Sequence, residues 1–216
     1  MKHYKLYIFD WDGTLMDSVS KIVDSMQAAA EQTELLVPTT VAVKNIIGAS
    51  LTEASKILFP GIGDVTTERL IKHYKQQYLS LNTTPSPLFG HAKQLLLALN
   101  QQDKLLAVAT GKGRQGLERV LAESDTKHLF HITRSSDDAL SKPHADMLEQ
   151  ILNELNITPN EALMIGDSSY DLKMAQNANI DSIGITHGVA CGDTLAQHQP
   201  KAIVHSIKEL ADLISH

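Results

Sequence analysis

The sequence predicts a doubly wound α/β fold, in which a parallel sheet carries an inserted all-helical segment. Short apolar, β-prone runs alternate with helical patterns along most of the chain, an order typical of a parallel sheet with helices on both faces. The stretch 17–82 interrupts this alternation and shows helical patterns alone. We therefore expect an α/β core formed by residues 1–16 and 83–216, and an inserted helical domain formed by residues 17–82.

Strands and helices of the core follow in order along the chain. Strands are predicted where the sequence is apolar and β-prone, at Tyr4–Phe9, Leu105–Ala109, Leu129–Thr133, Ala162–Ile165, Ser182–Ile185 and Ala202–Val204. Helices are predicted between most of them, at Arg114–Glu123, Ala145–Leu155, Tyr170–Gln176 and Ile207–Ile214. Sheets of this kind bind ligands at the carboxyl ends of their strands, so the loops that follow the strands are the expected site.

The inserted segment contains four predicted helices. Two are long, Ser18–Glu31 and Val65–Leu81, and two are shorter, Val41–Ile47 and Leu51–Leu58, with Gly48 between them. A polar linker with two prolines, Asn82–Pro87, closes the segment. The alternative is extra packing against the sheet, but an insertion directly after the first strand favours a lid over the site.

The composition limits the function classes. The chain has 216 residues, of which 43% are hydrophobic and 20% charged, as in a packed globular protein. The single cysteine, Cys191, excludes an intrachain disulfide and a cysteine zinc cage. The net charge of −6 argues against nucleic acid as a partner. No apolar run reaches the roughly 18 residues of a membrane span, and the apolar stretch before Asp10 is too short for a secretory signal core. We expect a cytoplasmic protein that acts on a small molecule.

Two of the loops after strands carry pairs of carboxylates. Asp10 and Asp12 leave the first strand in a tight glycine turn, and Asp167 and Asp171 follow the run Ala162–Ile165. Alone, the first pair also fits an ordinary Asp-Gly turn, and the second also fits acids placed at a helix N-terminus. A calcium loop does not fit the first pair, because the glycine and the closing glutamate of such a loop are missing.

Two other loops carry groups that bind anions. Thr110, Gly111 and Lys112 stand between a strand and a helix, where a hydroxyl and backbone amides form an anion site, although Thr110 also fits a simple helix cap. Lys142 precedes Pro143, which fits the first turn of the next helix. A cation at a helix N-terminus is unfavourable, so its presence favours an anion clamp over a solvated surface charge.

In a parallel sheet these four loops converge on one edge. Four carboxylates cannot all ionise side by side without a compensating cation, and Mg²⁺ is an oxygen-binding ion that pairs with phosphate. Thr110, the amides of Gly111 and Lys112, and the charge of Lys142 supply a cradle for phosphate. Acids with a metal on one side and anion donors on the other predict a phosphoryl-transfer site.

The sequence resembles the haloacid dehalogenase superfamily of hydrolases, in its phosphoglycolate-phosphatase-like branch. Asp10–Ser18 is similar to the first motif of that family, and Thr110, Lys142 and the pair Asp167 and Asp171 stand in order where its other motifs belong. The resemblance covers essentially the whole chain and implies a Rossmann-like core with a helical cap. It also implies an Mg²⁺-dependent phosphatase for small phosphate monoesters.

By this resemblance, Asp10 is the nucleophile that becomes an aspartyl phosphate, and Asp12 is the general acid and base. Asp10, the backbone carbonyl of Asp12 and Asp167 hold the Mg²⁺. Asp171 contacts the metal through water or orients Lys142. An acid at Asp12 argues against a dehalogenase, since a halide leaving group needs no proton.

The remaining roles implied by the resemblance concern the phosphate and the leaving group. Thr110 and Gly111 bind the phosphoryl oxygens, and Lys142 neutralises charge on the phosphate and on the nucleophile. The cap specificity loop is placed near Gly48, with Lys44 and Asn45 as candidates for contacts with the leaving group. The substrate is a small phosphorylated metabolite whose identity the residues leave open, as they do the oligomeric state.

Other functions stay open at this point. A phosphomutase of the beta-phosphoglucomutase type is the nearest alternative, followed by a pyrophosphatase or nucleotidase. Gly111, Gly113 and Gly116 also form a G-x-G-x-x-G pattern with Asp137 downstream, as in an NAD-dependent oxidoreductase, but this leaves both acid pairs unexplained. A phospho-receiver switch uses similar residues, yet such switches are shorter and lack a helical insert.

Overall fold

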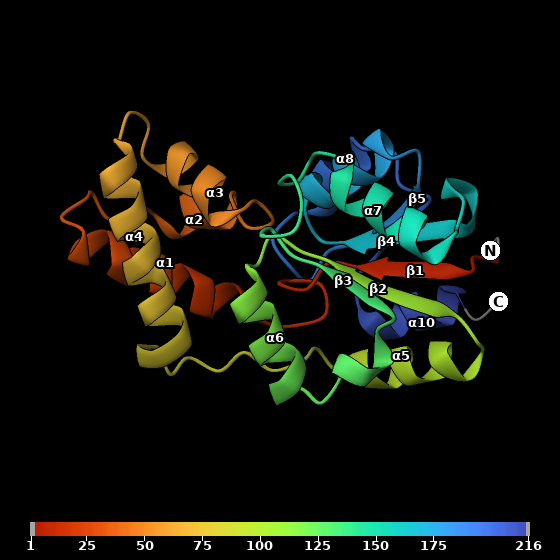
Figure 1. Cartoon of the computed structure of the whole chain (residues 1–216). Helices are drawn as coiled ribbons and strands as arrows, with labels where there is room; N and C mark the ends of the chain where they lie inside the picture. Colours follow the sequence, from red (N-terminus) through yellow and green to blue (C-terminus); the bar gives the residue numbers. More distant parts are fainter. Residues whose placement is uncertain (1–2, 215–216) are drawn as a thin grey trace.

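A computed structural model describes residues 3–214 and contains a single six-stranded sheet in this range (Figure 1). All strands are parallel, and their order is β3-β2-β1-β4-β5-β6. The strands are β1 (Leu6–Phe9), β2 (Leu105–Ala109), β3 (Ile132–Arg134), β4 (Ala162–Gly166), β5 (Asp181–Ile185) and β6 (Ala202–Val204). Strand β1 lies between β2 and β4, which places the loops after these three strands side by side at the carboxyl edge.

The sheet is covered on both faces, because the strand side chains alternate between two hydrophobic clusters. Tyr7 and Phe9 of β1 pack with α5 (Ala92–Gln101), α6 (Arg114–Glu123) and α10 (Ile207–Ile214). Leu6 and Ile8 face the other way and pack with α7 (Asp146–Leu155) and α8 (Ser169–Asn177). Figure 1 shows α7 and α8 on one side of the strands and α5 and α10 on the other. The short helix α9 (Gly192–Ala196) lies between β5 and β6 in the chain. The fold is the predicted doubly wound α/β fold.

A separate group of helices, here called the helical insertion, follows β1 and stands beside the sheet layer (Figure 1). It has its own hydrophobic cluster, in which Met26, Leu70 and Tyr74 are buried. The chain leaves and re-enters the sheet layer at neighbouring points, since Met16 bridges Leu88. The insertion consists of α1 (Val19–Gln32), α2 (Thr40–Lys44), α3 (Leu51–Leu58), α4 (Asp64–Gln76) and the π-helical turn Gln77–Leu81.

Several sequence-based boundaries were wrong. The strand expected at Leu129–Thr133 begins only at Ile132, because Lys127–Leu129 forms a 3₁₀ turn. Helices α5 and α9 were not predicted. Helix α7 begins at Asp146, so Pro143 precedes it instead of occupying its first turn, and the Lys142–Pro143 peptide bond is cis. Within residues 3–214 no helix is long and apolar enough to span a membrane.

Candidate active site at the carboxyl edge of the sheet

Three buried carboxylates meet where β1 and β4 end. Asp10 follows β1 directly, Asp167 follows β4, and Asp171 lies in the first turn of α8. One carboxylate oxygen from each lies within 4.8 Å of the others. Because β1 and β4 are paired in register, Asp10 and Asp167 leave the sheet at the same level. The structure therefore brings together three of the four predicted acids.

Lys142 is the cation inside this cluster. Its Nζ lies 2.8 Å from Oδ1 of Asp10 and 2.6 Å from Oδ1 of Asp171, and its side chain is fully buried. The two acids raise the pKa of Lys142 above its ordinary value, although burial acts in the opposite direction. The prediction that Lys142 belongs to the site is consistent with this position, but the helix-dipole argument for it was wrong. Helix α7 begins four residues later, so the lysine is not in its first turn.

The carboxylates carry more negative charge than one lysine balances. Burial raises the pKa of Asp10 to about 7; the charge of Asp171 adds to this rise, while Lys142 opposes it. Burial and the charges of Asp171 and Asp10 also raise the pKa of Asp167 well above its ordinary value. Oδ1 of Asp10 is buried, and the ammonium of Lys142, which it shares with Asp171, lies 2.8 Å from it. Three grouped carboxylates whose charge one lysine does not balance fit a hard divalent cation such as Mg²⁺.

Glycines let the surrounding backbone approach Asp167 closely. The Thr14 hydroxyl donates to Oδ1 of Asp167 at 2.7 Å, and the Val189 N–H donates to Oδ2 at 2.9 Å. A Cβ atom added at Gly13 or Gly188 would stand 2.3 or 2.0 Å from Oδ2 of Asp167. Both loops therefore require glycine, and together they fix the orientation of this carboxylate.

Asp171 is held by the residue that begins its own helix. The Ser168 N–H and hydroxyl donate to Oδ2 of Asp171 at 3.0 and 2.7 Å, which forms a capping box at the start of α8. Its other oxygen, Oδ1, accepts from Lys142. The alternative of a helix-terminal acid is thus correct for Asp171, and the same carboxylate also positions the lysine beside Asp10.

Asp12 is not part of this group of three acids. Its Oδ1 accepts from the Ser18 hydroxyl at 2.7 Å and lies 3.1 Å from Nζ of Lys112. The side chain of Lys112 is almost completely buried, and its ammonium donates to the Tyr78 hydroxyl at 3.1 Å. From the sequence, only the backbone amide of Lys112 was expected in the site. Its side chain joins the core to the helical insertion, a contact that depends on Tyr78, which lies 34 residues earlier.

The predicted phosphate-binding residues lie beside these acids. Thr110 is buried at the end of β2, and its hydroxyl accepts from the N–H of Lys112 at 3.2 Å. A Cβ atom added at Gly111 would stand 2.4 Å from the carbonyl oxygen of Gly48 and 2.7 Å from that of Ala49. The loop of the insertion therefore rests directly on Gly111.

A cavity lies between the sheet edge and the helical insertion and measures about 790 Å³, its open mouth included. Asp10, Asp12, Thr110, Gly111 and Gly48 are among its lining residues. Lys44 and Asn45, the other two cap candidates, are exposed and do not line it. The complete lining is Asp10, Asp12, Ile22, Met26, Ile46, Ile47, Gly48, Ala49, Leu51, Ala54, Tyr74, Lys75, Tyr78, Leu79, Thr110, Gly111, Lys112, Gly113, Gln115, Gly116 and Asp137.

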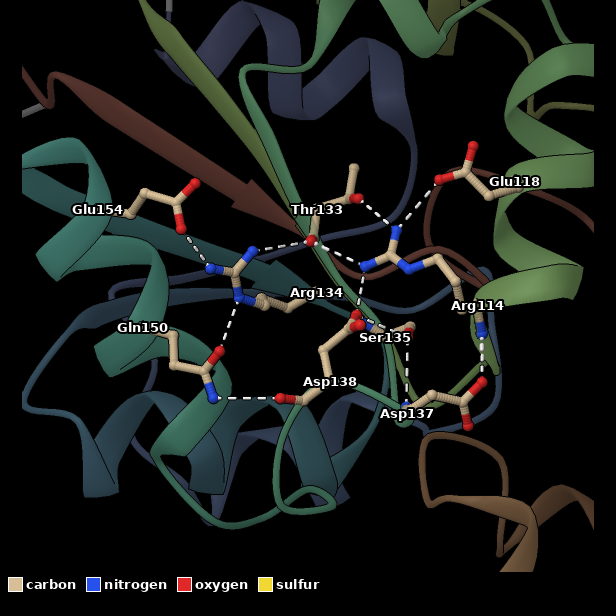
Figure 2. Close-up of polar contacts among 9 residues, drawn as sticks. All are labelled: Arg114, Glu118, Thr133, Arg134, Ser135, Asp137, Asp138, Gln150 and Glu154. Atoms are coloured by element: carbon tan, nitrogen blue, oxygen red, sulfur yellow. Dashed lines mark hydrogen bonds and ion pairs between the residues drawn. The ribbon is translucent and has the colours of Figure 1, made fainter.

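A polar network fixes the loops after β2 and β3 (Figure 2). The guanidinium of Arg114 donates to Oγ1 of Thr133 at 2.7 Å and pairs with Asp138. The N–H of Arg114, in the first turn of α6, donates to Oδ2 of Asp137 at 2.8 Å. Asp137 therefore caps the helix N-terminus where the dinucleotide alternative needs a pyrophosphate, which argues against that alternative.

Comparison with known proteins decides the family. The model of the haloacid dehalogenase-like hydrolase family matches residues 7–185, a range that contains every acid of the site together with Thr110 and Lys142. The chain belongs to this family. As a haloacid dehalogenase-like hydrolase it is an enzyme, and neither an oxidoreductase nor a receiver switch.

Relatives and solved structures agree with this family over nearly the whole chain. A phosphoglycolate phosphatase from Vibrio vulnificus is 27% identical over 219 residues, with 97% of this chain and 96% of that protein covered. A structure described as a predicted phosphatase from Clostridium acetobutylicum has a TM-score of 0.88 and 25% identity, and covers 99% of both chains. A structure from Bacteroides vulgatus named as a beta-phosphoglucomutase has a TM-score of 0.85 and 18% identity, with 97% and 87% covered, and shows the fold alone.

Proposed function

We propose that this hydrolase is an Mg²⁺-dependent phosphatase that cleaves small phosphate monoesters through an aspartyl phosphate on Asp10. The observation that carries the proposal is the buried carboxylate of Asp10, whose Oδ1 lies 2.8 Å from Nζ of Lys142 and which is grouped with the carboxylates of Asp167 and Asp171. A carboxylate desolvated in this way is a strong nucleophile once its charge is balanced. The phosphatases among the relatives support the same reaction class.

The donor set indicates how the metal is held. Asp10, Asp167 and the backbone carbonyl of Asp12 would bind Mg²⁺, and Asp171 would contact it through water while it orients Lys142. When bound, the ion neutralises the carboxylates and draws negative charge from the phosphoryl oxygens. Thr110 and the N–H of Gly111 would bind those oxygens from the other side.

The residues then divide the reaction into two displacements at phosphorus. A carboxylate oxygen of Asp10 attacks phosphorus and the ester P–O bond breaks, with its electron pair passing to the leaving oxygen, which takes a proton from Asp12. Asp12 next removes a proton from a water molecule whose oxygen attacks phosphorus. This second step breaks the bond to Asp10 and releases inorganic phosphate. Lys142 balances charge on Asp10 in both steps.

We also propose that the helical insertion acts as a cap, with residues 17–82 as one domain and residues 1–16 and 83–216 as the core. Support comes from contacts on both sides of the cavity, since the N–H of Ser50 donates to the Ser141 hydroxyl at 2.9 Å and Tyr78 accepts from Lys112. The loop at Gly48 is the part of the insertion that reaches the phosphate-binding residues. No role is assigned to Lys44 or Asn45.

Phosphate release from a panel of small phosphate esters tests the proposal. We expect release with Mg²⁺, none with a chelator, and none from Asp10→Asn at either condition, with the variant's thermal unfolding unchanged or raised. Asp24→Asn is a matched control, because Asp24 is exposed and lies outside the cavity lining. Release from wild type that persists with the chelator or in Asp10→Asn would contradict the proposal.

A phosphomutase is the second candidate, and the contact between the insertion and Gly111 favours it, because a mutase must exclude water from its intermediate. The two reactions differ in their products. A mutase converts a sugar monophosphate to its isomer without net release of phosphate, which ³¹P NMR follows directly. A phosphatase shows inorganic phosphate instead.

A further inference from the structure

The part of the cavity beyond the reacting carboxylates is apolar. The helical insertion supplies this wall, chiefly with Ile22, Met26, Ile47, Ala54, Tyr74 and Tyr78. The rings of Tyr74 and Tyr78 are stacked, with their centroids 5.8 Å apart and their planes 20° from parallel. Because Asp10 binds phosphorus in the proposed reaction, this wall contacts the leaving group and not the phosphate.

The cations in the lining do not alter this character. Lys112 is buried, but its ammonium already pairs with Asp12, donates to the Tyr78 hydroxyl and lies 4.2 Å from the centre of the Tyr78 ring. Lys75 is exposed, so its charge is hydrated. Asp137 adds a negative charge to the lining. In this structure the only buried cation among the described residues that line the cavity is therefore paired with Asp12.

The apolar wall has opposite effects on the binding of charged and of apolar leaving groups. A carboxylate or a second phosphate on the leaving group would lose hydration without gaining an unpaired buried cation, which is unfavourable. An aromatic or branched alkyl group would instead bury apolar surface against the isoleucines and Met26. A flat ring would also meet the stacked pair Tyr74 and Tyr78.

From this geometry we infer that the enzyme prefers phosphate monoesters of uncharged aromatic or branched alkyl alcohols over esters such as phosphoglycolate, whose leaving group carries a carboxylate. The inference rests on the proposed phosphatase function and names the substrate class for that same cavity. It separates this chain from the phosphoglycolate phosphatases that it resembles at 27% identity.

Three esters test the preference. All three have an alkoxide leaving group, so each leaving group requires a proton. Phosphate release from benzyl phosphate, ethyl phosphate and 2-phosphoglycolate is measured under identical conditions with Mg²⁺. We expect kcat/KM for benzyl phosphate to exceed that for each of the other two by at least about tenfold, the discrimination that an apolar pocket provides for a few carbon atoms. Equal or greater kcat/KM for phosphoglycolate would overturn the inference and leave the phosphatase function standing. No release from any of the three would contradict the phosphatase function itself.

A charged variant gives a second, internal test. Leu51 lines the cavity and is half-buried, so Leu51→Lys places a cation on the wall, whereas Leu97→Lys places one on the exposed side of α5 as a control. We expect the ratio of kcat/KM for benzyl phosphate to that for phosphoglycolate to fall at least about tenfold in Leu51→Lys alone. If Leu51→Lys does not fold, Met26→Ala replaces it and should lower the benzyl phosphate value without lowering that of phosphoglycolate. An unchanged ratio in the folded variant would overturn the inference.

Discussion

Replacing Gly111 by alanine would place a methyl group against the backbone of the helical insertion. The added Cβ would stand 2.4 Å from the carbonyl oxygen of Gly48 and 2.7 Å from that of Ala49. Backbone carbonyls cannot rotate away as a flexible side chain does. The substitution must therefore push the loop of the insertion away from the core.

The size of the displacement follows from these distances. The loop must withdraw by about 0.6 Å to bring the closest contact to 3.0 Å, the shortest separation that Cβ atoms adopt. Displacements near 1 Å at a site cost up to about 100-fold in rate, so we expect kcat/KM to fall about 10- to 100-fold. The core itself is not strained, and the cost in stability is at the low end of overpacking, about 1 kcal/mol, or about 2–4 °C in Tm.

Three measurements on Gly111→Ala test this reasoning. Steady-state phosphate release gives the rate, thermal unfolding gives the stability, and hydrogen exchange at the N–H of Ser50 reports on the insertion, since this group donates to Ser141. Gly90→Ala is the control, because no atom lies within 4 Å of a Cβ there. We expect faster exchange at Ser50 in Gly111→Ala only. A rate within about twofold of wild type together with unchanged exchange would refute the reasoning.

Three further predictions concern other parts of the structure. Lys142→Met leaves Asp10 without its buried partner and should lower the free energy of unfolding by about 3–5 kcal/mol in urea titrations without metal, whereas a loss below about 1 kcal/mol would contradict the assigned pairing. Lys112→Met should reduce kcat/KM at least about tenfold, because it removes the buried pair with Asp12. Lys75→Met, which removes an exposed lysine from the same cavity lining, should not. Equal effects of the two substitutions would contradict a role for the buried pair. Burial lowers the pKa of His187 in the folded protein below its ordinary value near 6.5. The folded protein therefore favours the neutral imidazole, and stability is lost as the pH falls below about 6.5 toward the pKa of the folded protein. The Tm of the wild type should therefore fall more steeply than the Tm of His187→Gln as the pH is lowered from 7.5 to 5. Parallel curves of Tm against pH would contradict the lowered pKa of His187.

The parallel sheet was predictable because short apolar, β-prone runs alternate with helical patterns along the chain. The strand at Leu105–Ala109 and the helix at Leu51–Leu58 agree with the structure at both ends. Helix α5 was missed although Leu95, Leu96 and Leu99 lie on one buried face, because it follows His91 in a left-handed conformation and has no capping side chain. Such a start leaves no signal in the sequence.

In the site, the acids that directly follow an apolar strand were the predictable residues. Asp10 and Asp167 directly follow apolar strands, so their convergence follows from a parallel sheet. Asp12 pairs with Lys112, whose buried ammonium also donates to the hydroxyl of Tyr78 in the insertion. A contact between residues this far apart in the sequence is not encoded in local periodicity and could not be predicted from it.

The most direct test of the account is the detection of phosphate on Asp10. Wild-type enzyme with Mg²⁺ and a ³²P-labelled ester is quenched in acid within the first turnovers, and the labelled peptide is identified. The account predicts an acid-stable, base-labile label on the peptide that contains Asp10, absent from Asp10→Asn and from enzyme treated with chelator. Continued turnover with no label on this peptide, or a label that survives in Asp10→Asn, would contradict it.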